Sequence, residues 1–210
     1  MLVLDLCCGA GGSAMGIMQA WPGCTIVGVD IKPQPHFPFE FIQDDWKNFL
    51  QRFGRDFNFI WAGPVCKRYT RMTNCRPGRS SFHPDDISIM RTMLQKIYRP
   101  WVIENVPGAP LQNPIILCGQ MFNLPIYRHR LFECSFLADQ PKHPQHKTPA
   151  SRAGHWEPGT ILSIAGNFSP VSLAREAMGI PWMTRNELSQ AIPPIYSKYI
   201  LKYSTRHSTY

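Results

Sequence analysis

The thiol of Cys66 is the side chain best placed to act as a nucleophile. It follows Gly63-Pro64-Val65 in a turn that comes directly after an apolar run, and Lys67 and Arg68 come next. A thiol attacks as its thiolate, and neighbouring cations favour that form. We therefore expect Cys66 to be a catalytic nucleophile. Packing in the apolar core is the expectation for Cys7, Cys24, Cys75, Cys118 and Cys134.

A glycine-rich turn near the start of the chain could bind a cofactor. Residues 8–13 read Cys-Gly-Ala-Gly-Gly-Ser, between a strand expected over residues 1–6 and a helix expected over Ala14 to Trp21. Such a turn lets backbone amides and the helix N-terminus approach a ligand closely. Asp30 ends the next expected strand, where a Rossmann-type acid binds a ribose hydroxyl pair. The pattern predicts a nucleoside cofactor, with an ordinary tight turn and a solvated strand end as the alternative.

The elements that must position these groups alternate between strands and helices. Strands are expected over residues 1–6, 24–30, 57–64 and 101–103, and a second helix over residues 84–96. The prolines at 33, 35 and 38 exclude a helix before about Asp45. This order predicts a Rossmann-like, doubly wound and mostly parallel α/β sheet, whose ligands bind at the carboxyl ends of the strands. Glu104, directly after the last strand, then lies on the same edge as Asp30 and Cys66.

Composition narrows the class of protein. A chain of 210 residues buries enough surface for one stable domain, which we assign to residues 1–210. Its apolar runs are too short to span a bilayer, and seven cysteines without a repeating spacing favour a reducing compartment. We expect a cytoplasmic protein that is not secreted. The net charge of +8 arises after residue 66, which is typical of a nucleic-acid-binding surface.

Six segments, in order, resemble the cytosine carbon-5 DNA methyltransferases. They are Asp-Leu-x-Cys-Gly-Ala-Gly-Gly from Asp5, Gly-Val-Asp to Asp30, Gly-Pro-x-Cys to Cys66, Glu-Asn-Val from Glu104, Arg-x-Arg from Arg128, and Gln-Ala-Ile-Pro-Pro from Gln190. The resemblance runs from Asp5 to Tyr199 and is closest to compact, phage-type members. It implies a class I S-adenosylmethionine-dependent methyltransferase fold. The implied cofactor is S-adenosyl-L-methionine, with S-adenosyl-L-homocysteine as product, and the implied substrate is DNA.

The resemblance also implies roles for individual residues. Cys66 would add to carbon 6 of cytosine, and Glu104 would grip ring nitrogen 3 and the exocyclic amine. Arg128 and Arg130, the latter the stronger candidate, would reach the cytosine carbonyl or a phosphate. Asp30 would bind the ribose and Asp45, with Asp44 as the alternative, the adenine amine. The implied cofactor-binding residues are Leu6, Cys8, Gly9, Ala10, Gly11, Gly12, Asp30, Ile31, Asp45, Gly63, Pro64 and Gln190.

The segment from Cys134 to Ser163 is shorter than the target-recognition region of that family. It is expected to be a small recognition loop or lobe that reads a short or lax site, or a plain linker, and a homodimer or protein partner would supply further surface. Cys134, His143, His146 and His155 match no common zinc-finger spacing, so the sequence predicts no metal site. The expected nucleic-acid-binding residues are Lys67, Arg68, Arg71, Arg76, Arg79, Lys142, Lys147 and Arg152.

Three positions depart from the family pattern. Val65 and Lys67 stand where the family has proline and glutamine around its nucleophile, and Ile126 stands where glutamine usually precedes Arg-x-Arg. Two other functions therefore stay open. One is methylation of cytosine in RNA such as tRNA, and the other is a catalytically weak or inactive protein that binds nucleic acid or a partner. The restriction–modification role of the family is likewise only implied by the resemblance.

Overall fold

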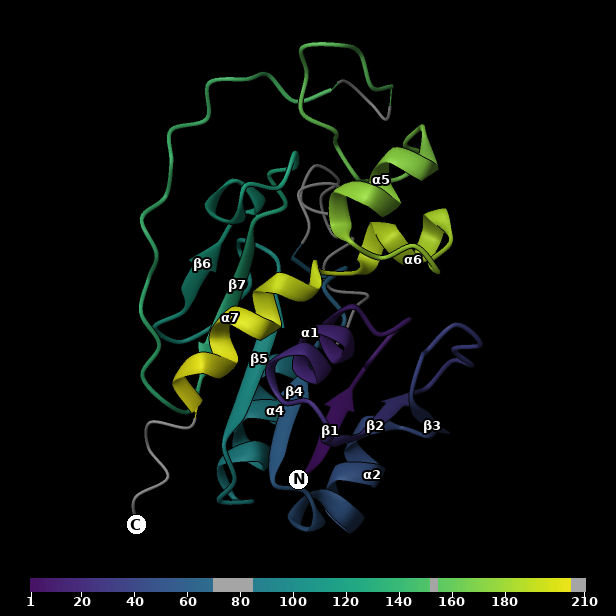
Figure 1. Ribbon diagram of the computed structural model, residues 1–210. Coiled ribbons are helices and arrows are strands. Elements are labelled where there is room, and N and C mark those ends of the chain that lie inside the picture. The colour runs from purple at the N-terminus through teal and green to yellow at the C-terminus, as the bar shows by residue number, and fades with distance from the viewer. Residues whose placement is uncertain (70–84, 152–154, 205–210) are drawn as a thin grey trace.

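The computed structural model describes residues 1–69, 85–151 and 155–204. Its centre is a seven-stranded sheet of order β3-β2-β1-β4-β5-β7-β6 (Figure 1). Strands β1 to β5 are parallel, and β7 runs antiparallel to both β5 and β6. The expected Rossmann-like, doubly wound and mostly parallel sheet is confirmed. The strands are β1 Leu2–Leu6, β2 Thr25–Asp30, β3 Glu40–Gln43, β4 Phe59–Ala62, β5 Trp101–Asn105, β6 Ile115–Leu117 and β7 Arg130–Cys134.

Helices cover both faces of the sheet, so its central strands are apolar on both sides. Val3 and Trp61 face α1 (Gly12–Ala20) and α7 (Pro194–Ser204) in one core cluster. Leu4 and Ile60, the alternate residues of the same strands, face α2 (Trp46–Phe53) and α4 (Asp86–Gln95) in a second. This alternation explains why the sequence shows unbroken apolar runs at β1 and β4.

Close contact between α1 and α7 requires glycine at position 16. A Cβ there would lie 1.9 Å from the carbonyl oxygen of Pro194, so no larger residue fits. Ser197 Oγ adds a hydrogen bond of 2.8 Å to the carbonyl oxygen of Ser13. The C-terminal helix thus folds back beside the first strand, since Ile200 and Leu201 share the core cluster of Val3.

A third core cluster lies over the carboxyl ends of the strands, under α5 (Val171–Met178) and α6 (Arg185–Gln190) (Figure 1). Ala10 of the glycine turn and Phe168 contribute to it. Ile126, which departs from the family pattern, is 1% exposed in this cluster. Its backbone also passes against Gly119, where a Cβ would lie 2.3 Å from the Ile126 carbonyl oxygen. An apolar residue at position 126 therefore serves packing.

Several expected boundaries are wrong. The first helix begins at Gly12 instead of Ala14, and Glu104 lies inside β5 instead of after it. Strands β3, β6 and β7 were not expected, since they are three to five residues long and partly exposed. Among the described residues, no helix is both long enough and apolar enough to cross a bilayer.

The expected recognition segment begins where β7 ends. It was expected over Cys134 to Ser163, and the described residues between β7 and α5, from Ser135 to Pro170, form neither helix nor strand apart from isolated bridges. Figure 1 shows the segment, in green, returning outside the β6 edge of the sheet to the end where α5 lies. It therefore ends near the carboxyl edge of the sheet, on the side where the candidate site residues lie.

Candidate active site

The glycine turn is held by the acid at the end of the neighbouring strand. Gly9 and Gly11 have φ of 49° and 84°, a left-handed conformation that favours glycine. The Gly9 amide donates to Asp30 Oδ2 at 3.1 Å, and the Asp30 Oδ1 atom accepts from the Lys32 amide at 3.0 Å. Asp30 therefore shapes the turn that it was expected to adjoin, and it is half-buried at the carboxyl edge as predicted.

Asp5 is a buried carboxyl group beneath this turn. It is 1% exposed, and Ser13 Oγ donates to its Oδ2 atom at 2.7 Å. Burial raises the pKa of Asp5 to about 8, with smaller contributions from the charges of Asp30 and Glu104. Asp5 begins the first of the six segments named in the sequence analysis. Its contact with Ser13 was not predictable, because the only sequence signal for Ser13 is its position directly after the glycines. A carboxyl group that holds its proton near neutral pH thus lies in the centre of the candidate site.

We expect Asp5→Asn to change how stability depends on pH. The folded pKa of about 8 exceeds that of an unfolded aspartate, about 4, so between these values the unfolded chain binds fewer protons. The free energy of unfolding of the unmodified protein then falls as pH rises from 4 to 8, by at most about 1.4 kcal/mol per pH unit for this group. Asparagine keeps an acceptor for Ser13 and does not titrate.

Urea unfolding of both proteins at several pH values measures this effect. The stability of Asp5→Asn relative to the unmodified protein should rise between pH 4 and 8 and stay level above 8. Two curves that run parallel over that whole range would show that Asp5 is ionised in the folded protein.

Two aspartates, Asp44 and Asp45, follow β3 directly and are the expected acids for the adenine amine. The Asp44 amide donates to the Asp30 carbonyl oxygen at 3.2 Å, so both neighbours lie beside Asp30. Asp45 is the N-cap of α2, and its Oδ1 atom accepts from the amides of Lys47 and Asn48. This capping role was not expected, and it fixes the direction in which the Asp45 carboxylate points.

Two aromatic residues near the glycine turn were missed as site residues. Trp182 Nε1 donates to the carbonyl oxygen of Ala10 at 3.0 Å, which ties the α5–α6 connection to the turn. Phe37 is buried, and a Cβ on Gly11 or Gly28 would lie 3.0 Å or 2.4 Å from its ring. Phe37 lies among prolines in a segment without periodicity, so no sequence signal marks it.

The turn that carries Cys66 is hydrogen-bonded to the two strands that flank β4. The Gly63 amide donates to the Leu6 carbonyl oxygen at 3.0 Å, and Asn105 Nδ2 donates to the Pro64 carbonyl oxygen at 2.9 Å. Asn105 is 1% exposed, so this second bond is fixed inside the protein. Cys66 follows as a half-buried residue whose carbonyl oxygen accepts from the Tyr69 amide at 2.9 Å. Its turn is therefore anchored despite having Val65, 48% exposed, at the family's second proline position.

Glu104 and Arg130 lie near Cys66 at the carboxyl edge of the sheet. Arg130 Nε lies 3.1 Å from Glu104 Oε1, and both side chains are largely buried. Burial raises the pKa of Glu104, while Arg130 and Arg128 oppose the shift. The pKa of the Cys66 thiol is also raised, by burial and by the charge of Glu104, against Arg130 and Arg128. The expectation that Lys67 and Arg68 favour the thiolate is wrong in this respect, since burial wins and the chief opposing cation is Arg130.

Arg128 does not reach outward to a base or a phosphate, so that expectation is corrected. Its φ is 39° and its guanidinium is turned into the protein. There it donates to the carbonyl oxygens of Ile164, Leu188, Ser189 and Ala191. Burial lowers the pKa of Arg128 well below its ordinary value. Arg128 thus joins the start of β7 to the segment around α6, whereas Arg130 is the arginine that lies in the site.

The remaining expected residues fall into four groups. Leu6, Cys8, Ala10 and Gly12 are buried in or beside the glycine turn, as predicted. Ile31 and Gln190 are exposed. No described residue forms a hydrogen bond with the Gln190 side chain. Lys67, Lys142 and Lys147 are exposed and Arg68 is half-buried. Four expected nucleic-acid-binding residues lie outside the described part of the chain, namely Arg71, Arg76, Arg79 and Arg152.

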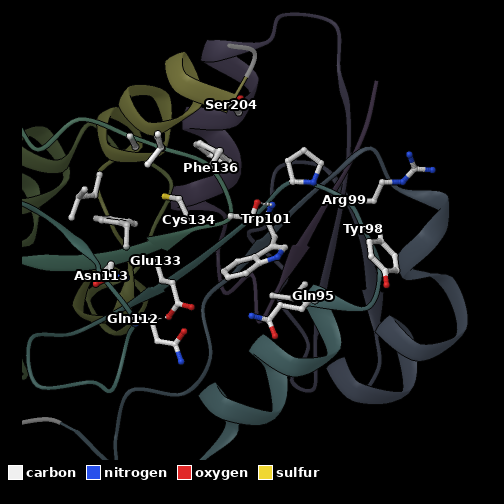
Figure 2. A pocket seen from close by; sticks show the side chains of 17 residues that line it. Gln95, Tyr98, Arg99, Trp101, Gln112, Asn113, Glu133, Cys134, Phe136 and Ser204 are labelled. Atoms are coloured by element: carbon white, nitrogen blue, oxygen red, sulfur yellow. Dashed lines mark hydrogen bonds between the residues drawn. The ribbon is translucent and has the colours of Figure 1, made fainter. Parts of the chain in front are cut away.

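A hollow of about 870 Å³ lies at the other end of the sheet. Figure 2 shows it around Trp101, the first residue of β5, with Glu133 and Gln112 on one side and Tyr98 and Arg99 on the other. Glu133 is paired there with Arg91 at 2.6 Å and accepts from the Gln112 amide at 2.8 Å. The carboxylate is thus satisfied by the protein itself, and this hollow is remote from Cys66 at the carboxyl edge.

Comparison with solved structures identifies the fold. The chain is similar to the methyltransferase EhMeth of Entamoeba histolytica, with 12% identity, 98% of each chain covered and a TM-score of 0.65. Lower similarity is found to the plantazolicin methyltransferase BpumL bound to SAH (18% identity, 50% and 39% covered, TM-score 0.35) and to a conserved hypothetical protein of Streptococcus pyogenes (15%, 69% and 90%, 0.39). No protein-family model and no curated protein matches the chain. The first similarity shows a class I methyltransferase fold.

Proposed function

We propose that the protein is an S-adenosylmethionine-dependent methyltransferase that methylates carbon 5 of cytosine in DNA. The observation that carries the proposal is the convergence of a thiol, a buried carboxyl group and an arginine at the carboxyl edge of this sheet. Cys66, Glu104 and Arg130 come from three separate segments and share one electrostatic environment. Ligands of open α/β sheets bind at this edge.

The glycine turn and its neighbours fit the cofactor. Positive φ at Gly9 and Gly11 shapes the turn, and a Cβ on Gly11 would lie 2.7 Å from Pro38. Because α1 begins directly after the turn, the helix N-terminus can approach a ligand. Asp30 and the pair Asp44 and Asp45 provide acceptors for ribose hydroxyls and for an amine. S-adenosylmethionine held by these residues would supply an electrophilic methyl group.

The residues of the site account for a covalent route. The Cys66 thiolate would form a bond from Sγ to carbon 6 of cytosine, which makes carbon 5 nucleophilic towards the sulfonium methyl. Transfer breaks the methyl–sulfur bond and releases S-adenosylhomocysteine. Loss of the proton from carbon 5 and breakage of the Sγ–carbon 6 bond then restore the aromatic base. Because a stacked cytosine hides carbon 6, the base must leave the duplex first.

Charge coupling between Glu104 and Cys66 supports the same route. The Glu104 carboxylate adds to the effect of burial in raising the pKa of Cys66, so protonation of Glu104 removes its share and leaves burial opposed by Arg130 and Arg128. Protonated Glu104 is also the form that donates to ring nitrogen 3 and stabilises negative charge on the base. Binding of cytosine to a protonated Glu104 would therefore activate the nucleophile in the same step.

Transfer of labelled methyl from S-adenosylmethionine tests the proposal. The purified protein is incubated with duplex DNA, single-stranded DNA and tRNA at one salt concentration, because phosphate contacts make binding depend on salt. We expect label in 5-methylcytosine of DNA. Label confined to tRNA would support the RNA alternative. A folded protein that binds the cofactor and labels none of these substrates would refute catalysis by this chain alone.

A further inference from the structure

A cluster of one cysteine and three histidines lies beside the arginine pair. Cys118 follows β6, His129 separates Arg128 from Arg130, and His143 and His146 belong to the segment after β7. The four ligand atoms that these side chains offer all lie within 4.8 Å of one another. Residues up to 28 positions apart in the chain thus meet at one point. Neither the methyl-transfer chemistry nor the core clusters use them as a group.

The donor set and its spacing are those of a zinc site. Cysteine thiolate and imidazole nitrogen are preferred zinc ligands, and four of them complete a tetrahedron. Bond lengths to zinc of about 2.3 Å for sulfur and 2.0–2.1 Å for nitrogen place neighbouring ligand atoms about 3.3–3.6 Å apart. Here Cys118 Sγ lies 3.3 Å from His146 Nε2, and His129 Nε2 lies 3.0 Å from His143 Nε2. The observed pairs therefore need only small shifts to surround an ion.

The orientation of the rings points to the same conclusion. His143 Nδ1 lies 2.8 Å from the Pro144 carbonyl oxygen, so its proton is on Nδ1 and Nε2 presents a lone pair to the cluster. A second contact that fixes the tautomer in this way is usual for zinc-bound histidine. Tyr127 stacks on His146 with ring centres 3.8 Å apart, which fixes that ring as well. Cys118 is fully buried, so its thiolate would be shielded from solvent.

We propose that Cys118, His129, His143 and His146 bind one structural zinc ion. Four protein ligands close the coordination sphere and leave no position for a substrate. The ion would fasten residues 143–146 to His129, which directly precedes Arg130 at the start of β7, and so hold this part of the recognition segment beside the active site. Cys134 and His155, which were considered from the sequence and not favoured as ligands, do not belong to this set, since Cys134 lies in β7 and His155 bridges to Ser169. The prediction of no metal site is replaced by this proposal, which does not depend on methyl transfer.

Metal content of the purified full chain tests the zinc site. The protein is purified from cells grown with added zinc, and gel filtration removes unbound metal. The zinc content is then measured by inductively coupled plasma mass spectrometry. We expect about one zinc per chain, as for a closed four-ligand site. Cys118→Ser and His143→Ala should lose most of it, while the matched controls Cys134→Ser and His155→Ala keep it. Retention of zinc by both cluster variants, or its loss in both controls, would overturn the proposal.

Cobalt substitution provides a readout of geometry. After removal of zinc with a chelator, titration of the unmodified protein with Co²⁺ should give the visible bands of tetrahedral cobalt and a thiolate-to-cobalt band in the near ultraviolet. Cys118→Ser should lose the thiolate band, and His143→Ala, a change at an exposed residue, covers the case in which Cys118→Ser fails to fold. A folded chain that contains no zinc and binds no Co²⁺ would show that the cluster is only hydrogen-bonded.

Discussion

Replacement of Cys66 by alanine is expected to lower methyl transfer to DNA at least about 1,000-fold, the scale on which removal of a nucleophile acts. Without Sγ no bond to carbon 6 can form, so carbon 5 stays unreactive towards the methyl group. The fold should survive, because Cys66 is half-buried in a turn that backbone and Asn105 contacts hold in place. Binding of S-adenosylmethionine should be nearly unchanged. Transfer of label and calorimetric binding of the cofactor measure the two effects separately.

Cys24→Ala is the matched control for that variant. Cys24 precedes β2 at the opposite end of the sheet and is 7% exposed, so the change removes a thiol without touching the site. We expect its transfer rate to stay within about twofold of the unmodified protein. Methyl transfer by Cys66→Ala at a similar rate would mean that the enzyme does not use this cysteine.

Replacement of Arg128 by leucine is expected to have the largest effect on stability. The guanidinium donates five partly buried hydrogen bonds to four carbonyl oxygens, three of them in or directly after α6 and one at Ile164. An unsatisfied buried acceptor costs about 1–3 kcal/mol. With partial rearrangement of the four acceptors, we expect the free energy of unfolding to fall by at least about 3 kcal/mol. Denaturation in urea gives this value.

Arg175→Leu is the comparison for that loss. Arg175 is also partly buried and also donates to a backbone carbonyl, but through one bond, from Nε to the Met183 oxygen at 2.8 Å. Both variants remove one positive charge, so a difference between them reports the number of carbonyl oxygens left unpaired. We expect about 1 kcal/mol for Arg175→Leu. Equal losses for the two would contradict the role assigned to Arg128.

The sheet and its edge were predictable because their signals are local. Apolar runs at β1, β2, β4 and β5, each followed by a glycine, an acid or a proline turn, indicate buried parallel strands without knowledge of their partners. The order along the chain then places Asp30, Cys66 and Glu104 at one edge. Short edge strands such as β6, three residues long, have too few residues for a periodic signal.

The environment of each site residue was less predictable than its position. Arg128 and Arg130 are two residues apart in one motif, yet one donates to four carbonyl oxygens and the other pairs with Glu104. Arg128 has a φ of 39°, and its guanidinium lies against carbonyl oxygens of α6. In the same way, the raised pKa of Cys66 depends on burial, which nearby charges in the sequence do not reveal. Contacts between distant segments decide both outcomes.

The zinc ligands illustrate the same limit. Sequence spacing favoured no set, since His143 and His146 are close in the chain while Cys118 and His129 come from the loops around η3 (Gly119–Phe122). Only the return of the segment after β7 along the sheet edge brings the four together (Figure 1). Cys118, expected as a plain core residue, is indeed buried, and its sulfur nevertheless faces His146.

Capture of the covalent intermediate tests the central claim most directly. Duplex DNA that contains 5-fluorocytosine is incubated with the protein and S-adenosylmethionine, and the mixture is denatured and digested for mass spectrometry. Fluorine at carbon 5 cannot leave as a proton does, so the methylated base should remain bonded to the enzyme. We predict a denaturation-resistant complex in which the fluorinated, methylated cytosine is attached to the peptide containing Cys66. Methylation of ordinary DNA with no adduct on the fluorinated substrate, or an adduct on another cysteine, would contradict the mechanism proposed for this site.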